Sequence, residues 1–247
     1  MHTTAATRGK YRSDTILSVQ PESMPVRSSY EAVLFDIDGT LCEYDRTAED
    51  LLPIAFERAG VDPFFTPGEY IDRYGEFVED SDGVQSLREQ IFATLAEENG
   101  RPPEAGRTVA REYASERDHA NVQFTPGAAR LLESVVDTYP TGVVTNGGPE
   151  MQETKLAALG IEDRFETVVY AGYDTPAKPD PEPFETAIAA LETDPARTLY
   201  VGDSLSADVA GAQNAGLPVA WLGDGTSEPD PTPDRILDSL RELQAIL

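Results

Sequence analysis

The sequence predicts an α/β fold, a Rossmann-like doubly wound parallel sheet into which an α-helical domain is inserted. Two observations carry this prediction. A short apolar run at 32–35 ends in acidic and glycine residues, which is typical of a buried parallel strand. After residue 126, short apolar runs alternate with helical stretches, and this βαβ rhythm indicates a parallel sheet with helices on both faces.

The individual elements follow the same patterns along the chain. Short apolar runs predict further strands at 142–145, 167–170, 198–201 and 219–222. Helices are predicted between and after them, at about 127–137, 149–159, 181–192, 206–215 and 234–246. Between the first strand and this region the apolar residues have helical spacing, as in Leu51, Leu52, Ala55, Phe56 and Ala59, and in Leu87, Ile91, Phe92, Leu95 and Ala96.

We therefore expect three parts. Residues 30–46 plus 125–247 would form the core that carries the sheet, and residues 47–124 the inserted helical domain. Residues 1–29 hold four basic and two acidic residues, against 15 basic and 43 acidic in the remainder, and they lack periodicity. We expect them to be disordered, and a native start at Met24 would remove no predicted core element.

The charge balance limits the partners. The chain has 19 basic and 45 acidic residues, a net charge of −26. Nucleic acid and anionic membranes are polyanions, so an acidic surface repels both. The sequence has no stretch apolar enough for a membrane helix and no signal-peptide core, so we expect a cytoplasmic protein. Because the acids are scattered, they favour the solvated surface of a halophilic archaeal protein over a tail that captures a basic partner.

Cysteine and histidine are scarce. The single cysteine, Cys42, cannot form an intrachain disulfide, and we expect it to be a buried packing residue. The two histidines, His2 and His119, lie far apart in sequence, which disfavours a histidine-rich zinc site. Acid–base chemistry should therefore fall to carboxylates.

Polar residues follow the predicted strands. In parallel sheets, ligands bind at the carboxyl ends of the strands, so these residues should converge at one edge. Four segments lie where a strand ends or a helix begins: Asp36-Ile37-Asp38-Gly39, Thr145-Asn146-Gly147, Lys178-Pro179, and Gly202-Asp203-Ser204 with Asp208 five positions beyond Asp203. Together they supply four carboxylates, one hydroxyl and one lysine.

This set of groups suits the transfer of a phosphoryl group. Packed carboxylates repel one another unless a cation holds them, and oxygen ligands select a hard ion such as Mg²⁺. Phosphoryl transfer requires positioning and neutralisation of the equatorial oxygens, which Lys178 and the Thr145 hydroxyl can supply. A carboxylate nucleophile gives an aspartyl-phosphate, and a second carboxylate two residues on can protonate the leaving oxygen and later activate water.

Four motifs occur in the order DIDGTL, VVTNG, KPDP and GDSLSADV, and they resemble those of the haloacid dehalogenase (HAD) superfamily. The match covers nearly everything after residue 30. Within the superfamily, the sequence resembles the phosphatase branch that has a helical cap of the C1 type. The insert at 47–124 lies at a position similar to that of this cap.

The resemblance implies a role for each motif residue. Asp36 would be nucleophile and metal ligand. Asp38 would be general acid and base, and its backbone carbonyl would contact the metal. Thr145 and Lys178 would bind the phosphoryl group, with Asn146 and Gly147 also in the substrate site. Asp203 would be a metal ligand and Asp208 a further ligand or a partner of one.

Other activities remain open. A 2-haloacid dehalogenase uses the same nucleophile but needs no acid at the position of Asp38, and a phosphomutase shares all four motifs. A receiver-type signalling domain places its acidic pair and its phospho-accepting aspartate in the reverse order, and a kinase would need a glycine-rich Lys-Ser/Thr loop that the sequence lacks. As substrate of a phosphatase we expect a small phosphate ester: a sugar phosphate, phosphoglycolate or a nucleotide.

Overall fold

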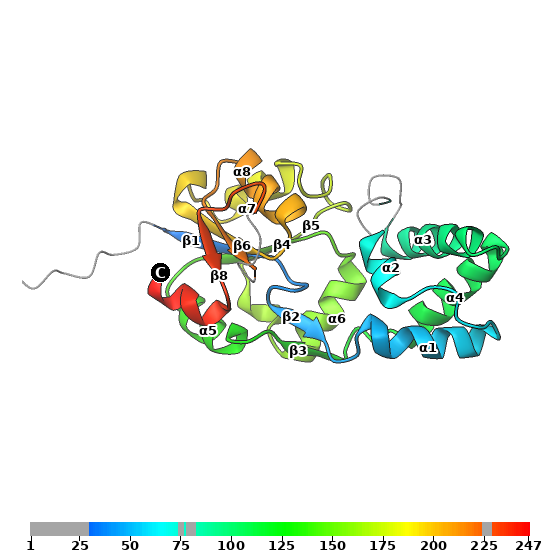
Figure 1. Cartoon of the computed structure of the whole chain (residues 1–247). Coiled ribbons are helices and arrows are strands. Elements are labelled where there is room, and N and C mark those ends of the chain that lie inside the picture. The colour runs from blue at the N-terminus through cyan, green and yellow to red at the C-terminus, as the bar shows by residue number, and fades with distance from the viewer. Residues whose placement is uncertain (1–29, 74–76, 78–82, 224–228) are drawn as a thin grey trace, which may run out of the picture.

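The computed structural model describes residues 30–73, 77, 83–223 and 229–247, so the segment 1–29, predicted to be disordered, lies outside the described residues. Its centre is a six-stranded parallel sheet with the order β5-β4-β1-β6-β7-β8 (Figure 1). The strands are β1 (Ala32–Phe35), β4 (Thr141–Thr145), β5 (Thr167–Tyr170), β6 (Thr198–Gly202), β7 (Val219–Leu222) and β8 (Arg235–Leu237).

The central strand β1 explains why its sequence is a continuous apolar run. It pairs with β4 on one side and β6 on the other, so neither edge meets solvent. Successive side chains point to opposite faces of a sheet. Val33 and Phe35 accordingly belong to one hydrophobic core cluster, while Ala32 and Leu34 belong to another. Both faces are covered, and all four residues are fully buried.

Helices cover both faces of the sheet, which confirms the predicted doubly wound α/β class. The first face packs against α5 (Ala128–Val135), α6 (Pro149–Leu159) and a C-terminal 3-10 helix (Leu240–Ala245). The second packs against α7 (Glu182–Ala190) and α8 (Ala210–Asn214), which continues a π-helical turn at Leu205–Val209. Short 3-10 turns lie at Glu162–Arg164 and Pro195–Arg197.

Four helices lie together beside the sheet and form a hydrophobic cluster of their own (Figure 1). They are α1 (Ala48–Ala59), α2 (Pro67–Asp72), α3 (Val84–Glu98) and α4 (Pro103–Glu116). Gly106 allows α4 to approach α3 closely, because a Cβ there would lie 1.9 Å from the Phe92 carbonyl oxygen. None of the described helices is long and apolar enough to cross a membrane.

A two-stranded antiparallel sheet lies at the entry to and exit from these helices. It pairs β2 (Cys42–Tyr44) with β3 (Val122–Phe124). The prediction that residues from about 47 to 124 form helices is therefore wrong at its C-terminal end, where Val122–Phe124 form β3. The run Val-Gln-Phe is too short for a periodicity to identify, and its strand character depends on a partner 80 residues earlier in the chain. Cys42 is fully buried, as predicted, and burial raises its pKa to about 12.

The predicted helix near 234–246 is also wrong in its first part. Residues 235–237 are the edge strand β8, which pairs with β7 in register Trp221↔Ile236, and only Leu240–Ala245 is helical, as a 3-10 helix. Ile236, Leu237, Leu240 and Leu243 have helical spacing in the sequence. The open edge of β7 overrides that pattern, because pairing satisfies its backbone groups.

Candidate active site

The carboxyl ends of three neighbouring strands hold the predicted residues. Asp36 directly follows β1, Thr145 is the last residue of β4, and Asp203 directly follows β6. Because β1 lies between β4 and β6, the three residues meet at one edge of the sheet. The structure thus brings together the segments that are far apart in the sequence.

Lys178 enters this edge from the loop between β5 and α7, and its side chain is buried. Its Nζ lies 2.8 Å from Asp36 Oδ1 and 2.7 Å from Asp208 Oδ1. It also donates to the Val144 carbonyl at 2.9 Å and to the Tyr200 hydroxyl at 3.0 Å. Burial lowers the pKa of Lys178, but Asp208 and Asp36 outweigh burial, and the net pKa is raised. The ammonium form is therefore fixed beside the proposed nucleophile.

Asn146 holds the Lys178 loop in place. Its Nδ2 donates to the Lys178 carbonyl at 3.1 Å, and its Oδ1 accepts from the Lys178 backbone N–H at 2.8 Å. Both polar atoms of the Asn146 side chain therefore form hydrogen bonds with the Lys178 backbone. The structure gives Asn146 a supporting contact, and the predicted contact of Asn146 with substrate stays a prediction.

Three carboxylates form a cluster next to Lys178. One oxygen from each of Asp36, Asp203 and Asp208 lies within 4.8 Å of the others. Burial, followed by Asp208 and Asp203, raises the pKa of Asp36 well above its ordinary value against the opposing effect of Lys178. Burial, followed by Asp208, raises the pKa of Asp203 to about 7, although this side chain keeps an exposed edge.

The donor set fits a hard divalent cation. All three groups offer oxygen, and three carboxylates with one ammonium leave net negative charge at neutral pH when they are ionised. Gly39 lets Asp203 lie close to the loop after β1, because a Cβ at Gly39 would lie 2.2 Å from Asp203 Oδ2. Gly39 also has φ +77°, a conformation that favours glycine. A cation here would favour the ionised carboxylates and reverse their raised pKa values.

Asp208 differs from the other two carboxylates, since protein donors already occupy both of its oxygens. Oδ1 accepts from Lys178 and from the Tyr200 hydroxyl, at 2.7 and 2.8 Å. Oδ2 accepts from the backbone N–H groups of Asp203 and Ser204, at 3.1 and 2.9 Å. Asp208 therefore anchors the lysine and the turn that carries Asp203, and its predicted contact with a metal stays a prediction.

The hydroxyl oxygen of Thr145 accepts two hydrogen bonds. Its Oγ1 accepts from the Gly147 N–H at 3.2 Å and from Gln152 Nε2 at 2.8 Å. Two donors occupy the oxygen, so the hydroxyl proton must point elsewhere and is available to an acceptor such as a phosphoryl oxygen. Gly147 contributes by leaving room, because a Cβ there would lie 2.0 Å from Gln152 Nε2.

Asp38 is held by two residues that the sequence analysis did not identify. Lys155 Nζ lies 2.5 Å from Asp38 Oδ1, and Gln152 Nε2 lies 2.8 Å from Oδ2. A third missed residue, Tyr200, contacts Lys178 and Asp208 from inside β6. The scarcity of lysine was a usable signal for Lys155, since Lys10, Lys155 and Lys178 are the only lysines in the chain.

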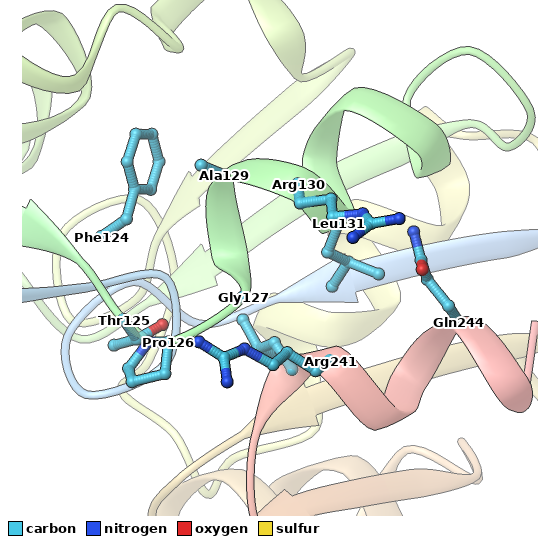
Figure 2. A pocket seen from close by; sticks show the side chains of 10 residues that line it. Phe124, Thr125, Pro126, Gly127, Ala129, Arg130, Leu131, Arg241 and Gln244 are labelled. Carbon is cyan, nitrogen blue, oxygen red and sulfur yellow. The ribbon is translucent and has the colours of Figure 1, made fainter.

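Two surface pockets lie near this region but not at the carboxylates. One, of about 670 Å³, lies between the start of α5 and the C-terminal 3-10 helix, with Arg130 and Arg241 on its walls (Figure 2). Another, of about 590 Å³, reaches the Asp36–Asp38 loop at Gly39. None of the predicted catalytic, substrate or metal residues lines either pocket, although Gly39, which lies against Asp203, lines the second.

The parallel sheet carries a cluster of carboxylates at the ends of its strands, in a Rossmann-like arrangement. The family profile of haloacid dehalogenase-like hydrolases matches residues 30–216. The chain belongs to this family, and it is a hydrolase.

The chain is also similar to named phosphatases. It is 28% identical over 241 residues to the phosphoserine phosphatase of Thermus thermophilus, and this alignment covers 85% of this chain and 96% of that protein. It is 35% identical over 210 residues to the glyceraldehyde 3-phosphate phosphatase of Pyrococcus furiosus, covering 79% and 81%. Its fold matches that of the magnesium-bound HAD hydrolase YfnB of Bacillus subtilis, with a TM-score of 0.75 and 24% identity over 88% of this chain and 98% of that one.

Proposed function

We propose that this hydrolase is a Mg²⁺-dependent phosphatase that acts on a small phosphomonoester through an aspartyl-phosphate at Asp36. The observation that carries the proposal is the cluster of Asp36, Asp203 and Asp208, whose oxygens lie within 4.8 Å of one another beside one buried lysine. When its carboxylates are ionised, the cluster keeps negative charge that one lysine does not neutralise, and a cation beside a carboxylate nucleophile suits an anionic substrate.

Asp36, Asp203 and the Asp38 backbone carbonyl would hold the Mg²⁺, with Asp208 as a further partner. When bound, the ion supplies neutralisation of the charge on the phosphoryl oxygens and orients them. Lys178 and the Thr145 hydroxyl bind the remaining phosphoryl oxygens. These contacts would hold the phosphorus in front of the Asp36 carboxylate.

The reaction has two steps. In the first, an Asp36 oxygen bonds to phosphorus, the bond from phosphorus to the ester oxygen breaks, and protonated Asp38 gives its proton to that oxygen. In the second, the ionised Asp38 takes a proton from water, whose oxygen bonds to phosphorus. The bond between phosphorus and Asp36 then breaks, which releases phosphate and regenerates the Asp36 carboxylate and the protonated Asp38.

The relatives support the substrate class. We infer a sugar phosphate, phosphoglycolate, a nucleotide or a similarly small ester, because the named relatives act on phosphoserine and on glyceraldehyde 3-phosphate. The helices α1–α4 lie between the first two motifs in sequence, and we propose that residues 47–124 act as the cap that closes over this substrate.

Hydrolysis of p-nitrophenyl phosphate tests the proposal. The wild type should release p-nitrophenol with Mg²⁺ and lose this activity in EDTA, and Asp36→Asn should be inactive while keeping the wild-type melting curve. A panel of small phosphate esters would then identify the preferred substrate. Equal rates for the wild type and Asp36→Asn would overturn the assignment of Asp36.

A further inference from the structure

Two polar residues of α6, Gln152 and Lys155, are buried although neither belongs to the four motifs. They lie three positions apart, so they share one face of the helix, and that face meets the active-site edge of the sheet. Their side-chain contacts converge on Asp38 and Thr145, the proposed proton donor and a proposed phosphoryl ligand.

Lys155 places a buried charge against the exposed carboxylate of Asp38. The Lys155 side chain is 1% exposed, the Asp38 side chain 44%. The Lys155 ammonium also lies 4.8 Å from the ring centroid of Tyr44, whose hydroxyl is 2.7 Å from His119 Nδ1. An exposed carboxylate needs no partner to remain in water, whereas burying a lysine is costly unless it is paired. The desolvation of Lys155 makes the Lys155–Asp38 ion pair a weak source of stability. We therefore attribute the pair to its effect on the position of the Asp38 carboxylate.

Gln152 is a second buried polar residue that contacts Asp38. It is fully buried, and its Nε2 donates to Asp38 Oδ2 and to Thr145 Oγ1, both at 2.8 Å. Its Oε1 is buried without a hydrogen-bond partner among the described residues. The donating end must face Asp38, because an amide oxygen there would meet a carboxylate. A buried amide with one end unpaired costs stability, and the hydrogen bonds that its nitrogen donates to Asp38 and Thr145 offset that cost.

We propose that Gln152 and Lys155 are positioning residues that fix the Asp38 carboxylate and the Thr145 hydroxyl for the phosphatase reaction. Each oxygen of Asp38 is held from the helix side by one donor, while the exposed side of the carboxylate faces solvent and can meet the leaving oxygen. Gln152 links the proton donor directly to the phosphoryl ligand, so the two groups keep a fixed relative position. This inference rests on the proposed phosphatase function.

Proton donation can be measured through the leaving group. An alkyl phosphate needs a proton on its departing oxygen, whereas p-nitrophenolate leaves almost unaided. Lys155→Met and Gln152→Leu should therefore lower kcat/KM for an alkyl phosphate at least about tenfold more than for p-nitrophenyl phosphate. The value of kcat/KM reports the steps up to release of the alcohol, so slow breakdown of the aspartyl-phosphate does not disturb the comparison.

Controls separate positioning from folding. Thr154→Val changes an exposed residue of the same helix, whose hydroxyl donates to the Glu150 carbonyl, and it should leave both kcat/KM values unchanged. A variant that merely misfolds in part lowers both values by the same factor. Gln152→Asn, which keeps the amide on a shorter chain, should recover part of the alkyl activity that Gln152→Leu loses.

The outcomes distinguish this inference from the proposed function. If the wild type hydrolyses neither ester with Mg²⁺, the phosphatase proposal itself fails. If the wild type is active and the variants keep its ratio of alkyl to aryl kcat/KM, the phosphatase proposal stands and the positioning role is wrong. A selective loss of alkyl activity in both variants supports it.

Discussion

Replacing Lys178 by methionine tests the electrostatics of the site. The substitution keeps most of the side-chain volume and removes a buried ammonium that contacts Asp36 and Asp208. Both carboxylates are themselves nearly buried and would be left without a positive partner. Breaking a buried ion pair by removing one partner costs about 3–5 kcal/mol. For a chain of this size that corresponds to a fall in Tm of roughly 10 °C.

The assay is thermal or urea unfolding at neutral pH in EDTA, at one fixed salt concentration. Lys155→Met is the matched control, because it removes the same group from a pair whose carboxylate is 44% exposed. It should cost less, since solvent screens the remaining charge of Asp38. Added Mg²⁺ should restore more stability to Lys178→Met than to the wild type, because the variant site carries more negative charge. A Lys178→Met protein as stable as the wild type in EDTA would refute the account of these contacts.

Three further predictions concern neighbouring groups. The folded pKa of Asp203 is raised to about 7 from 3.8, so its stabilising contribution is complete below the lower value and is lost as the pH rises through the higher one. Unfolding in EDTA should show this decline between about pH 4 and 7, and Asp203→Asn or saturating Mg²⁺ should reduce it. Tyr200→Phe should lower the free energy of unfolding by about 1–3 kcal/mol, because its hydroxyl is bonded inside the buried cluster; an unchanged urea midpoint would contradict this. Gly147→Ala should reduce phosphatase activity by displacing Gln152, whereas Gly68→Ala, whose Cβ would meet nothing closer than 3.9 Å, should not; equal rates for the two variants would show that the contact is unimportant.

The sequence predicts the main sheet well because its strands are buried on both faces. A strand such as 32–35 is then apolar at every position, and that signal is local. The pair β2 and β3 and the edge strand β8 have only three residues each, and they depend on partners elsewhere in the chain. No window of sequence contains the information that makes them strands.

The same distinction applies to the site. Asp36, Thr145 and Asp203 lie at strand ends, so a parallel sheet alone predicts that they converge. Gln152 and Lys155 lie within a helix, and their importance depends on which face of α6 is buried. Exposed glutamines and lysines look the same in sequence as buried ones. The scarcity of lysine in the chain is a signal for Lys155, but for Gln152 only the packing of α6 against the sheet shows the burial.

Detection of phosphorylated Asp36 tests the central claim most directly. Wild type and Asp38→Asn would be mixed with p-nitrophenyl phosphate and Mg²⁺, quenched in acid after short times, and digested for mass spectrometry. The account predicts a phosphoryl group on the peptide that contains Asp36, and more of it in Asp38→Asn, because the second step lacks its base. An active enzyme that never carries a phosphoryl group at Asp36 under these conditions would contradict the two-step mechanism.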